Sequence, residues 1–90
     1  MMWNIVQTSQ FKKDLKRHKH DNEKIDLLNE VLITLAETGA VPRELNPHKL
    51  TGNYKGHMEC HIQSDFLLIW IDMEKKTIKL VRLGSHSELF

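Results

Sequence analysis

Residues 57–70, HMECHIQSDFLLIW, constrain the fold of this chain more than any other segment. The first half alternates, with Met58, Cys60 and Ile62 on one side and polar side chains between them. Because successive side chains of a β-strand face opposite sides of the sheet, this alternation predicts a strand with one buried and one polar face. A short turn then leads into the apolar run 66–71, which is typical of a central strand. The segment therefore predicts two paired strands beside a polar face that carries histidines and acids.

Two helices are predicted upstream of these strands. Thr8 or Ser9 can cap the first helix, because a hydroxyl oxygen accepts a hydrogen bond from an unpaired N–H of the first turn. Asp21 or Asn22 can cap the second helix in the same way, and Gly39 suits the left-handed position that ends it. The apolar stripe of the second helix consists of Ile25, Leu28, Leu32 and Leu35, widened by Leu27, Val31 and Ala36.

A short strand at residues 3–6 and a last strand at residues 77–83 complete the predicted elements, and residues 40–56 form a long connection. The order is strand, helix, helix and then three strands whose short connections favour antiparallel neighbours. We therefore expect one α+β domain over residues 1–90, with two N-terminal helices packed on one face of a small, mainly antiparallel sheet. The other face of this sheet is expected to stay open.

The charged residues are unevenly distributed, although the formal net charge of the chain is only +1. One acid, Asp14, stands in residues 11–20 among the basic residues Lys12, Lys13, Lys16, Arg17 and Lys19. A concentrated basic patch is what a phosphate-rich partner binds, and a solvated helix face has the same composition. The pattern leaves both interpretations open.

The single cysteine and the short apolar runs bear on the cellular compartment. Cys60 has no second cysteine to pair with, and its place on the apolar side of a strand predicts a buried thiol in a reducing environment. The longest apolar run is six residues, far below the ~20 that a membrane helix needs. The first residues lack the features of a signal peptide. We expect a soluble, cytoplasmic protein without a membrane partner.

Five side chains are candidates for acid–base chemistry: His48, His61, Asp65, Arg82 and His86. Histidine serves as acid or base near neutral pH, and arginine binds phosphate through a planar fork of donors. Such groups can cleave RNA without a metal. One removes the proton of the ribose 2′-hydroxyl, another protonates the leaving 5′-oxygen, and the cation stabilises the phosphorane. Small domains also carry scattered histidines, so composition alone does not decide between a site and no site.

A metal site is the alternative for the polar strand face. His57, Glu59 and His61 share that face and could supply zinc ligands. Cys60 points away from them, and no recognised ligand spacing is met. We therefore expect neither a metal nor another cofactor.

The direction in which Arg82 points is not fixed by the pattern. Strict alternation places it on the side of Ile78 and Leu80, which have the character of core residues. Either a bulge near the strand end turns Arg82 outward, or Val81 and Leu83 face the core instead.

Several short segments occur together in a characteristic order and spacing: 47–52 (PHKLTG), 54–56 (YKG), 59–62 (ECHI) through Asp65 and Phe66, 82–86 (RLGSH), and the closing Leu89 and Phe90. In these segments the chain resembles the YafQ-type branch of the RelE/ParE superfamily, toxins of bacterial type II toxin–antitoxin systems. The predicted order of elements agrees with that family, and the likeness covers nearly the whole chain.

The resemblance implies an endoribonuclease that enters the ribosomal A site, cuts messenger RNA and is inhibited by a cognate antitoxin. It implies an acid–base set of His48, His61, Asp65 and His86, with Arg82 as the transition-state cation. Phe90 is then expected to position the RNA, and Phe66, where the family often has tryptophan, to stack on a base. Docking on 16S ribosomal RNA would fall to the basic residues Lys12, Lys13, Lys16 and Arg17.

Two other functions compete with this hypothesis. A non-catalytic toxin of the same fold could bind and poison a protein target such as DNA gyrase, as ParE-like members do. An inert module could hold RNA through its basic helix. The nuclease is favoured because a binding-only protein has no use for three histidines that converge with Asp65 and Arg82.

Overall fold

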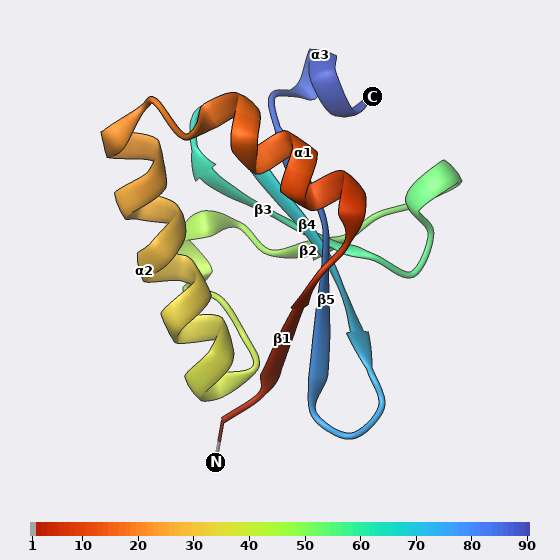
Figure 1. Ribbon diagram of the computed structural model, residues 1–90. Helices are drawn as coiled ribbons and strands as arrows, with labels where there is room; N and C mark the ends of the chain where they lie inside the picture. The colour runs from red at the N-terminus through yellow and green to blue at the C-terminus, as the bar shows by residue number, and fades with distance from the viewer. Residues whose placement is uncertain (1) are drawn as a thin grey trace.

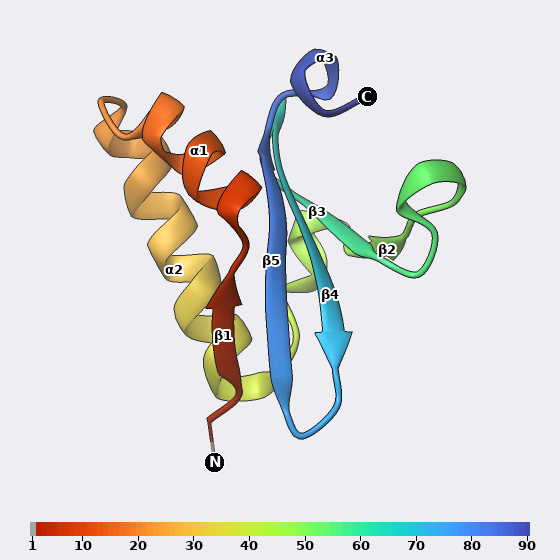
Figure 2. The same ribbon diagram turned by 45° about the vertical axis from the view of Figure 1, so that its right-hand side comes forward.

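The computed structural model describes residues 2–90 as a five-stranded sheet with two helices on one face (Figure 1). The strands lie in the order β1-β5-β4-β3-β2, and in Figure 2 the sheet separates α1 and α2 from the opposite, open side. The elements are β1 Asn4–Gln7, α1 Ser9–His18, α2 Asn22–Thr38, β2 His48–Lys49, β3 Met58–Gln63, β4 Phe66–Met73, β5 Thr77–Gly84 and α3 His86–Leu89, with 3₁₀ turns at Arg43–Leu45 and Gly52–Tyr54.

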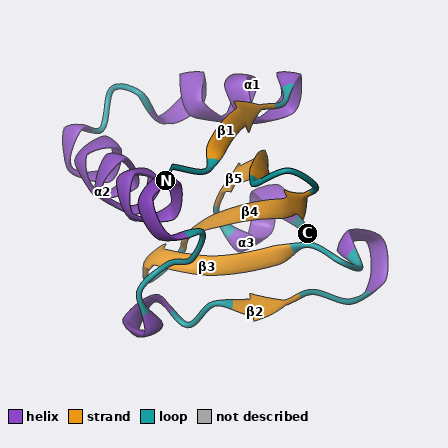
Figure 3. Cartoon of the chain, turned by 90° about the horizontal axis from the view of Figure 1, so that it is seen from below, coloured by secondary structure: helices purple, strands orange, loops and turns teal. Residues whose placement is uncertain are grey.

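The strand pairing confirms the predicted α+β class and the mainly antiparallel sheet. β1 runs parallel to β5, and the other three pairings are antiparallel. Two elements differ from the sequence prediction. β2 lies inside the segment that was expected to be a connection, at the outer edge of the sheet beside β3 (Figure 3). The tail folds into the short helix α3, where the pattern predicts no element.

The predicted helix ends are confirmed. The Thr8 hydroxyl oxygen accepts the N–H of Phe11 at 3.1 Å, and the Asp21 carboxylate accepts the N–H of Lys24 at 3.2 Å. Gly39 ends α2 with a φ of 76°, a conformation that glycine adopts without strain. Over residues 2–90 the structure contains no helix that is both long enough and apolar enough to cross a membrane.

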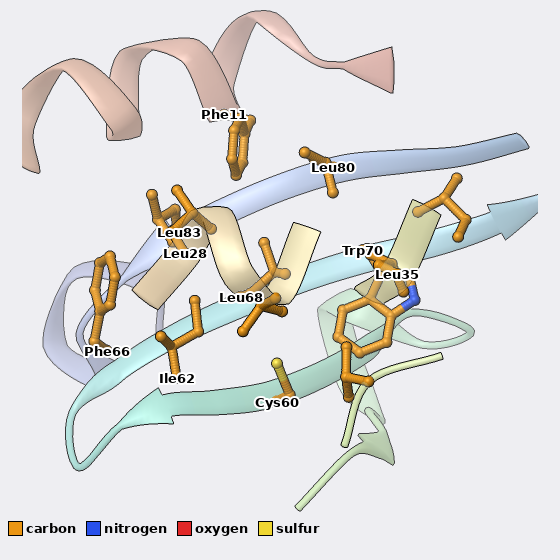
Figure 4. Packing of buried hydrophobic residues seen from close by; sticks show 13 residues of the cluster. Phe11, Leu28, Leu35, Cys60, Ile62, Phe66, Leu68, Trp70, Leu80 and Leu83 are labelled. Atoms are coloured by element: carbon orange, nitrogen blue, oxygen red, sulfur yellow. The ribbon is translucent and has the colours of Figure 1, made fainter. Parts of the chain in front are cut away.

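The core lies between the helices and the sheet. Phe11 from α1 and Leu35 from α2 pack toward Leu68 and Trp70 of β4, and all four side chains are at most 2% exposed (Figure 4). Each such side chain contributes about 1.5–3 kcal/mol on burial. Cys60 lies in the same cluster, as the alternation predicted. Burial, with a smaller effect of the neighbouring Glu59 charge, raises the pKa of its thiol to about 12, so the thiol stays neutral.

A register shift between β4 and β5 decides where Arg82 points. Ile69 lies opposite Arg82, whereas the next residue of β4, Trp70, lies opposite Leu80. β5 therefore carries an extra residue, and Leu80 and Leu83 are both fully buried in the cluster beneath the helices. Of the two alternatives for this strand, the bulge is the one that the structure adopts.

Candidate active site

The sheet register aligns functional side chains in one row across the open face. His48 of β2 lies opposite Glu59 of β3, Glu59 opposite Ile69 of β4, and Ile69 opposite Arg82 of β5. Neighbouring strands are about 4.8 Å apart, so Glu59 and Arg82 lie roughly 10 Å apart, with an apolar residue between them. β2 is needed for this row, because its pairing with β3 brings His48 from the long connection to the edge of the sheet.

Glu59 is a member of the site that sequence reasoning did not include in the acid–base set. Its side chain is 4% exposed, and its Oε1 lies 3.1 Å from Nε2 of His48 and 3.7 Å from Nε2 of His61. The other oxygen, Oε2, is buried and has no hydrogen-bond partner among the described residues. Nδ1 of His48 donates to the Asn46 carbonyl at 2.8 Å, which turns Nε2 toward the carboxylate. The signal in the sequence was the i, i+2 spacing of Glu59 and His61 on one strand face.

The C-terminal helix brings His86 to the same face. Ser85 and Glu88 form a capping box that starts α3, in which each side chain accepts a backbone N–H of the other residue. Oδ1 of Asp65 accepts two hydrogen bonds from His86, from its backbone N–H and from Nδ1, both at 2.9 Å. Both bonds hold the pKa of Asp65 below its usual range, and the bond from the backbone N–H has the larger effect. Asp65 therefore stays ionised beside the ring, and Nε2 of His86 is left for a substrate.

Aromatic rings connect these groups into one cluster. The ring centroid of His61 lies 6.0 Å from that of His48 and 5.8 Å from that of His86. The Phe90 ring lies 6.1 Å from His86 and 5.6 Å from Tyr54, between centroids. The three predicted histidines thus converge, and Phe90 lies beside them.

The terminal residues anchor α3 in unequal ways. Leu89 is 6% exposed and packs against Leu67 and Ile69 on the open face, whereas Phe90 is 61% exposed. Of the two apolar terminal side chains, Leu89 is therefore the one that packs in the interior. Phe90 remains accessible to a planar ligand such as a base.

Arg82 is held by two neighbours that the sequence did not indicate. Its Nε donates to Oδ2 of Asp14 at 2.8 Å, its Nη2 to Oδ1 at 3.3 Å, and its Nη1 to the Tyr54 hydroxyl at 3.2 Å. The hydrogen bonds to Asp14 raise the pKa of Arg82 further above its already high value. The Arg82 side chain is 18% exposed, so the cation borders the open face and keeps a fixed orientation.

Phe66 lies in the core and not on the open face, contrary to the expectation that it stacks on an RNA base. Its ring is 1% exposed and belongs to the core beneath the helices, with His18 at 5.2 Å between ring centroids and the Lys24 ammonium 5.1 Å from its centroid. A ring covered in this way cannot stack on a base. The apolar run that contains Phe66 is buried on both faces of the sheet, so its pattern did not reveal which side chains face the helices.

The basic residues of α1 differ in their surroundings. Lys12, Lys13 and Lys16 are exposed and available to a polyanion. Arg17 instead pairs with Glu88 of α3, with its Nη1 3.3 Å from Oε2. This pair ties α1 to the helix that carries His86.

His48, Glu59 and His61 also form a possible ligand set for a metal ion, because one donor atom from each lies within 4.8 Å of the others. Imidazole nitrogen with carboxylate oxygen suits zinc or copper. The zinc set suggested by the sequence, with His57, is therefore replaced by one with His48. An ion bound here would occupy the same nitrogen and oxygen atoms that could transfer protons.

The arrangement is suited to general acid–base catalysis on a phosphodiester. A buried carboxylate flanked by two imidazoles lies at one end, and an imidazole paired with an ionised carboxylate lies at the other. Arg82 lies in the same row of the sheet as the buried carboxylate, two strands away. The histidine rings are close enough for opposite ends of the cluster to reach one phosphate group.

Comparison with known proteins gives consistent matches over nearly the full length. Residues 3–90 match the family described as bacterial toxin of type II toxin–antitoxin system, YafQ. The chain is 33% identical to the mRNA interferase toxin YafQ of Escherichia coli K12, over 96% of this chain and 94% of that protein. A metal-bound toxin from Helicobacter pylori has 38% identity and a TM-score of 0.86, covering 99% of this chain and 100% of that chain. YafQ in the E. coli DinJ–YafQ toxin–antitoxin complex has 25% identity and a TM-score of 0.84, covering 100% and 99%.

Proposed function

The chain belongs to the YafQ family of bacterial toxins of type II toxin–antitoxin systems, and from this membership we propose that it is an endoribonuclease, an mRNA interferase. Its substrate is messenger RNA in the ribosomal A site, it acts in the cytoplasm, and a cognate antitoxin inhibits it. The observation that carries this proposal is the convergence of His48, His61 and His86 on the open sheet face, with Glu59 between two of them and Arg82 in the same row of the sheet. The E. coli relative in complex with DinJ supports the antitoxin as a partner.

The base belongs to the Glu59 end of the cluster. Removal of the 2′-hydroxyl proton needs a group that is unprotonated and oriented before the substrate binds. The Glu59 carboxylate can take up that proton directly or through the ring of His61, whose Nε2 faces it. Both nitrogens of His48 are already engaged, one with the Asn46 carbonyl and one with Glu59. His61, 3.7 Å from Oε1 of Glu59, lies between this end and His86. The deprotonated 2′-oxygen then attacks the adjacent phosphorus.

The acid is His86. Its Nδ1 proton points to Asp65, which fixes the orientation of the ring, and Nε2–H of the imidazolium form can protonate the leaving 5′-oxygen. Arg82 donates N–H groups to the phosphorane oxygens, where negative charge develops in the transition state. Phe90, next to His86, offers a ring on which a base can stack.

The identity of the new RNA ends tests this chemistry. In a purified translation mixture, attack by the 2′-oxygen leaves a 2′,3′-cyclic phosphate and a 5′-hydroxyl, in register with codons. A single 2′-deoxy nucleotide at the scissile position should abolish cleavage there and leave other sites intact. Ends with a 5′-phosphate, or cleavage that persists at the deoxy position, would show attack by water instead. Blocked translation with an intact message would favour a toxin that only binds its target.

Docking on ribosomal RNA is proposed for the exposed lysines of α1. Replacing Lys12, Lys13 and Lys16 with glutamine should weaken ribosome binding and flatten its salt dependence, since fewer counterions are released. The slope of log K against log salt should fall by about 0.7–0.9 for each phosphate that the helix no longer neutralises. Filter binding to ribosomes over a potassium chloride series measures it.

The control for this experiment is Lys75→Gln, in the exposed turn between β4 and β5. Thermal unfolding of both variants should match the unmodified protein. An unchanged slope in the α1 variant would mean that this helix faces away from RNA.

A further inference from the structure

Asp14 is a fully buried acid on a helix whose basic neighbours are exposed. Burying a carboxylate is unfavourable unless hydrogen bonds replace its water. Its oxygens accept bonds from Arg82, from the backbone N–H of Leu83 at 3.0 Å and from Nε2 of Gln10 at 3.2 Å. Burial raises the pKa of Asp14, but the hydrogen bonds lower it by more. The bond from Arg82 has the largest effect among them, and the pKa lies below its ordinary value. The group is therefore charged at neutral pH.

The position of Asp14 follows from the sheet topology. β1 pairs with β5 only as far as Leu80, and the chain then turns into α1. Beyond that point the edge of β5 has no strand beside it, and α1 supplies the missing partners. The Thr8 hydroxyl donates to the Val81 carbonyl at 3.3 Å, and Asp14 accepts the N–H of Leu83. These bonds bracket Arg82 and fix the backbone from which its side chain extends.

The guanidinium of Arg82 is fixed at two ends. Of its five N–H donors, two point to the Asp14 oxygens and one to the Tyr54 hydroxyl. The other two make no hydrogen bond to the residues that the structure describes. A donor that is oriented before the substrate binds loses less freedom in the transition state and stabilises developing charge more effectively. The planar fork–fork contact with a carboxylate also sets the plane of the guanidinium.

We propose that Asp14 is a positioning residue for RNA cleavage, which holds Arg82 so that its two remaining N–H groups meet the phosphorane oxygens. This role rests on the proposed nuclease function and adds a residue that does not touch the substrate. The competing role is structural only, in which the ion pair fastens α1 to β5 and has no effect on the chemical step. The two roles differ in whether the effect of Asp14 on the reaction depends on Arg82.

The first test measures kcat and KM for steady-state cleavage of ribosome-bound message by Asp14→Asn. The positioning role predicts a lower kcat, whereas a purely structural role predicts no change in kcat. Asparagine keeps the size of the side chain but presents an amide N–H₂ where the guanidinium needs an acceptor. We expect kcat to fall by about 10–10²-fold, the effect of a misplaced catalytic group, with KM changed by less than about threefold. The control is Asp26→Asn, an exposed acid on α2, which should leave both constants unchanged.

The decisive measurement is a double-mutant cycle with Arg82→Gln. If Asp14 acts through Arg82, adding Asp14→Asn to Arg82→Gln should lower kcat no further, although it should restore part of the stability lost when Arg82 is removed. Multiplicative losses in kcat would overturn the positioning role, and so would a wild-type kcat in Asp14→Asn. If Asp14→Asn does not fold, Asp14→Glu replaces it in the same cycle, because it keeps the charge and the acceptor oxygens but moves them by one methylene group relative to the guanidinium. A wild-type protein that cuts no message overturns the nuclease function itself, and the positioning role falls with it.

Discussion

Replacing His86 with glutamine is expected to slow cleavage of ribosome-bound message by about 10²–10⁴-fold, the usual contribution of an acid–base group. Nδ1 of His86 is bound to Asp65 at 2.9 Å, which leaves Nε2 as the atom that can give a proton to the 5′-oxygen. Glutamine has no proton of suitable acidity to give. The backbone N–H of residue 86 still binds Asp65, so α3 should stay in place. Single-turnover cleavage measures the chemical step directly.

The matched control is His20→Gln, which changes an exposed histidine between α1 and α2 and should leave the rate unchanged. Both variants should unfold within about 0.5 kcal/mol of the wild type, as is usual for surface substitutions. Leu89→Ala provides a second arm, because it loosens the anchor of α3 against Leu67 and should slow cleavage while leaving His86 intact. Wild-type cleavage by His86→Gln would remove this residue from the mechanism.

Sequence patterns predicted much of the fold because they reflect interactions between residues that are close together in the chain. The alternation in β3 reflects which side chains meet the helices, and Cys60 and Ile62 are indeed in the core. Thr8 and Asp21 cap the helices through bonds that span three residues. Ser85 and Glu88 show the same kind of short-range signal, and the capping box they form could have predicted α3.

Contacts between distant segments could not be derived from such patterns. The bond between Asp14 and Arg82 joins residues 68 positions apart, and neither neighbourhood indicates the other. In the sequence Asp14 is one acid among the basic residues of the first helix, and nothing there indicates a role for it. In the fold its carboxylate accepts hydrogen bonds from Gln10, Arg82 and the backbone of Leu83. Glu59 illustrates the same limit, because its place between two histidines depends on the pairing of β2 with β3. The prediction for Phe66 was wrong for another reason. The first part of β4 is buried on both faces, so apolar and polar residues do not alternate there and the sequence does not show which face each side chain is on.

Glu59 and Asp14 are both buried acids, but their hydrogen bonding differs in a way that predicts opposite effects on stability. Both Asp14 oxygens have partners, whereas Oε2 of Glu59 has no partner among the described residues. A buried carboxylate that is only partly satisfied destabilises the folded state. Such a residue is expected where catalysis requires it, because active sites often reduce stability.

Glu59→Gln is therefore expected to slow cleavage by about 10²–10⁴-fold, since the amide cannot accept the 2′-hydroxyl proton, and to leave the free energy of unfolding unchanged or raised. Asp14→Asn should lower the unfolding free energy by contrast, because it disrupts a buried pair whose atoms are satisfied. Urea unfolding and single-turnover cleavage on the same protein preparations give both quantities. A Glu59→Gln variant that cuts at the wild-type rate would exclude Glu59 as the base. A Glu59→Gln variant that loses as much stability as Asp14→Asn would contradict the expected difference between the two buried acids, and would mean that the Glu59 carboxylate supports the fold.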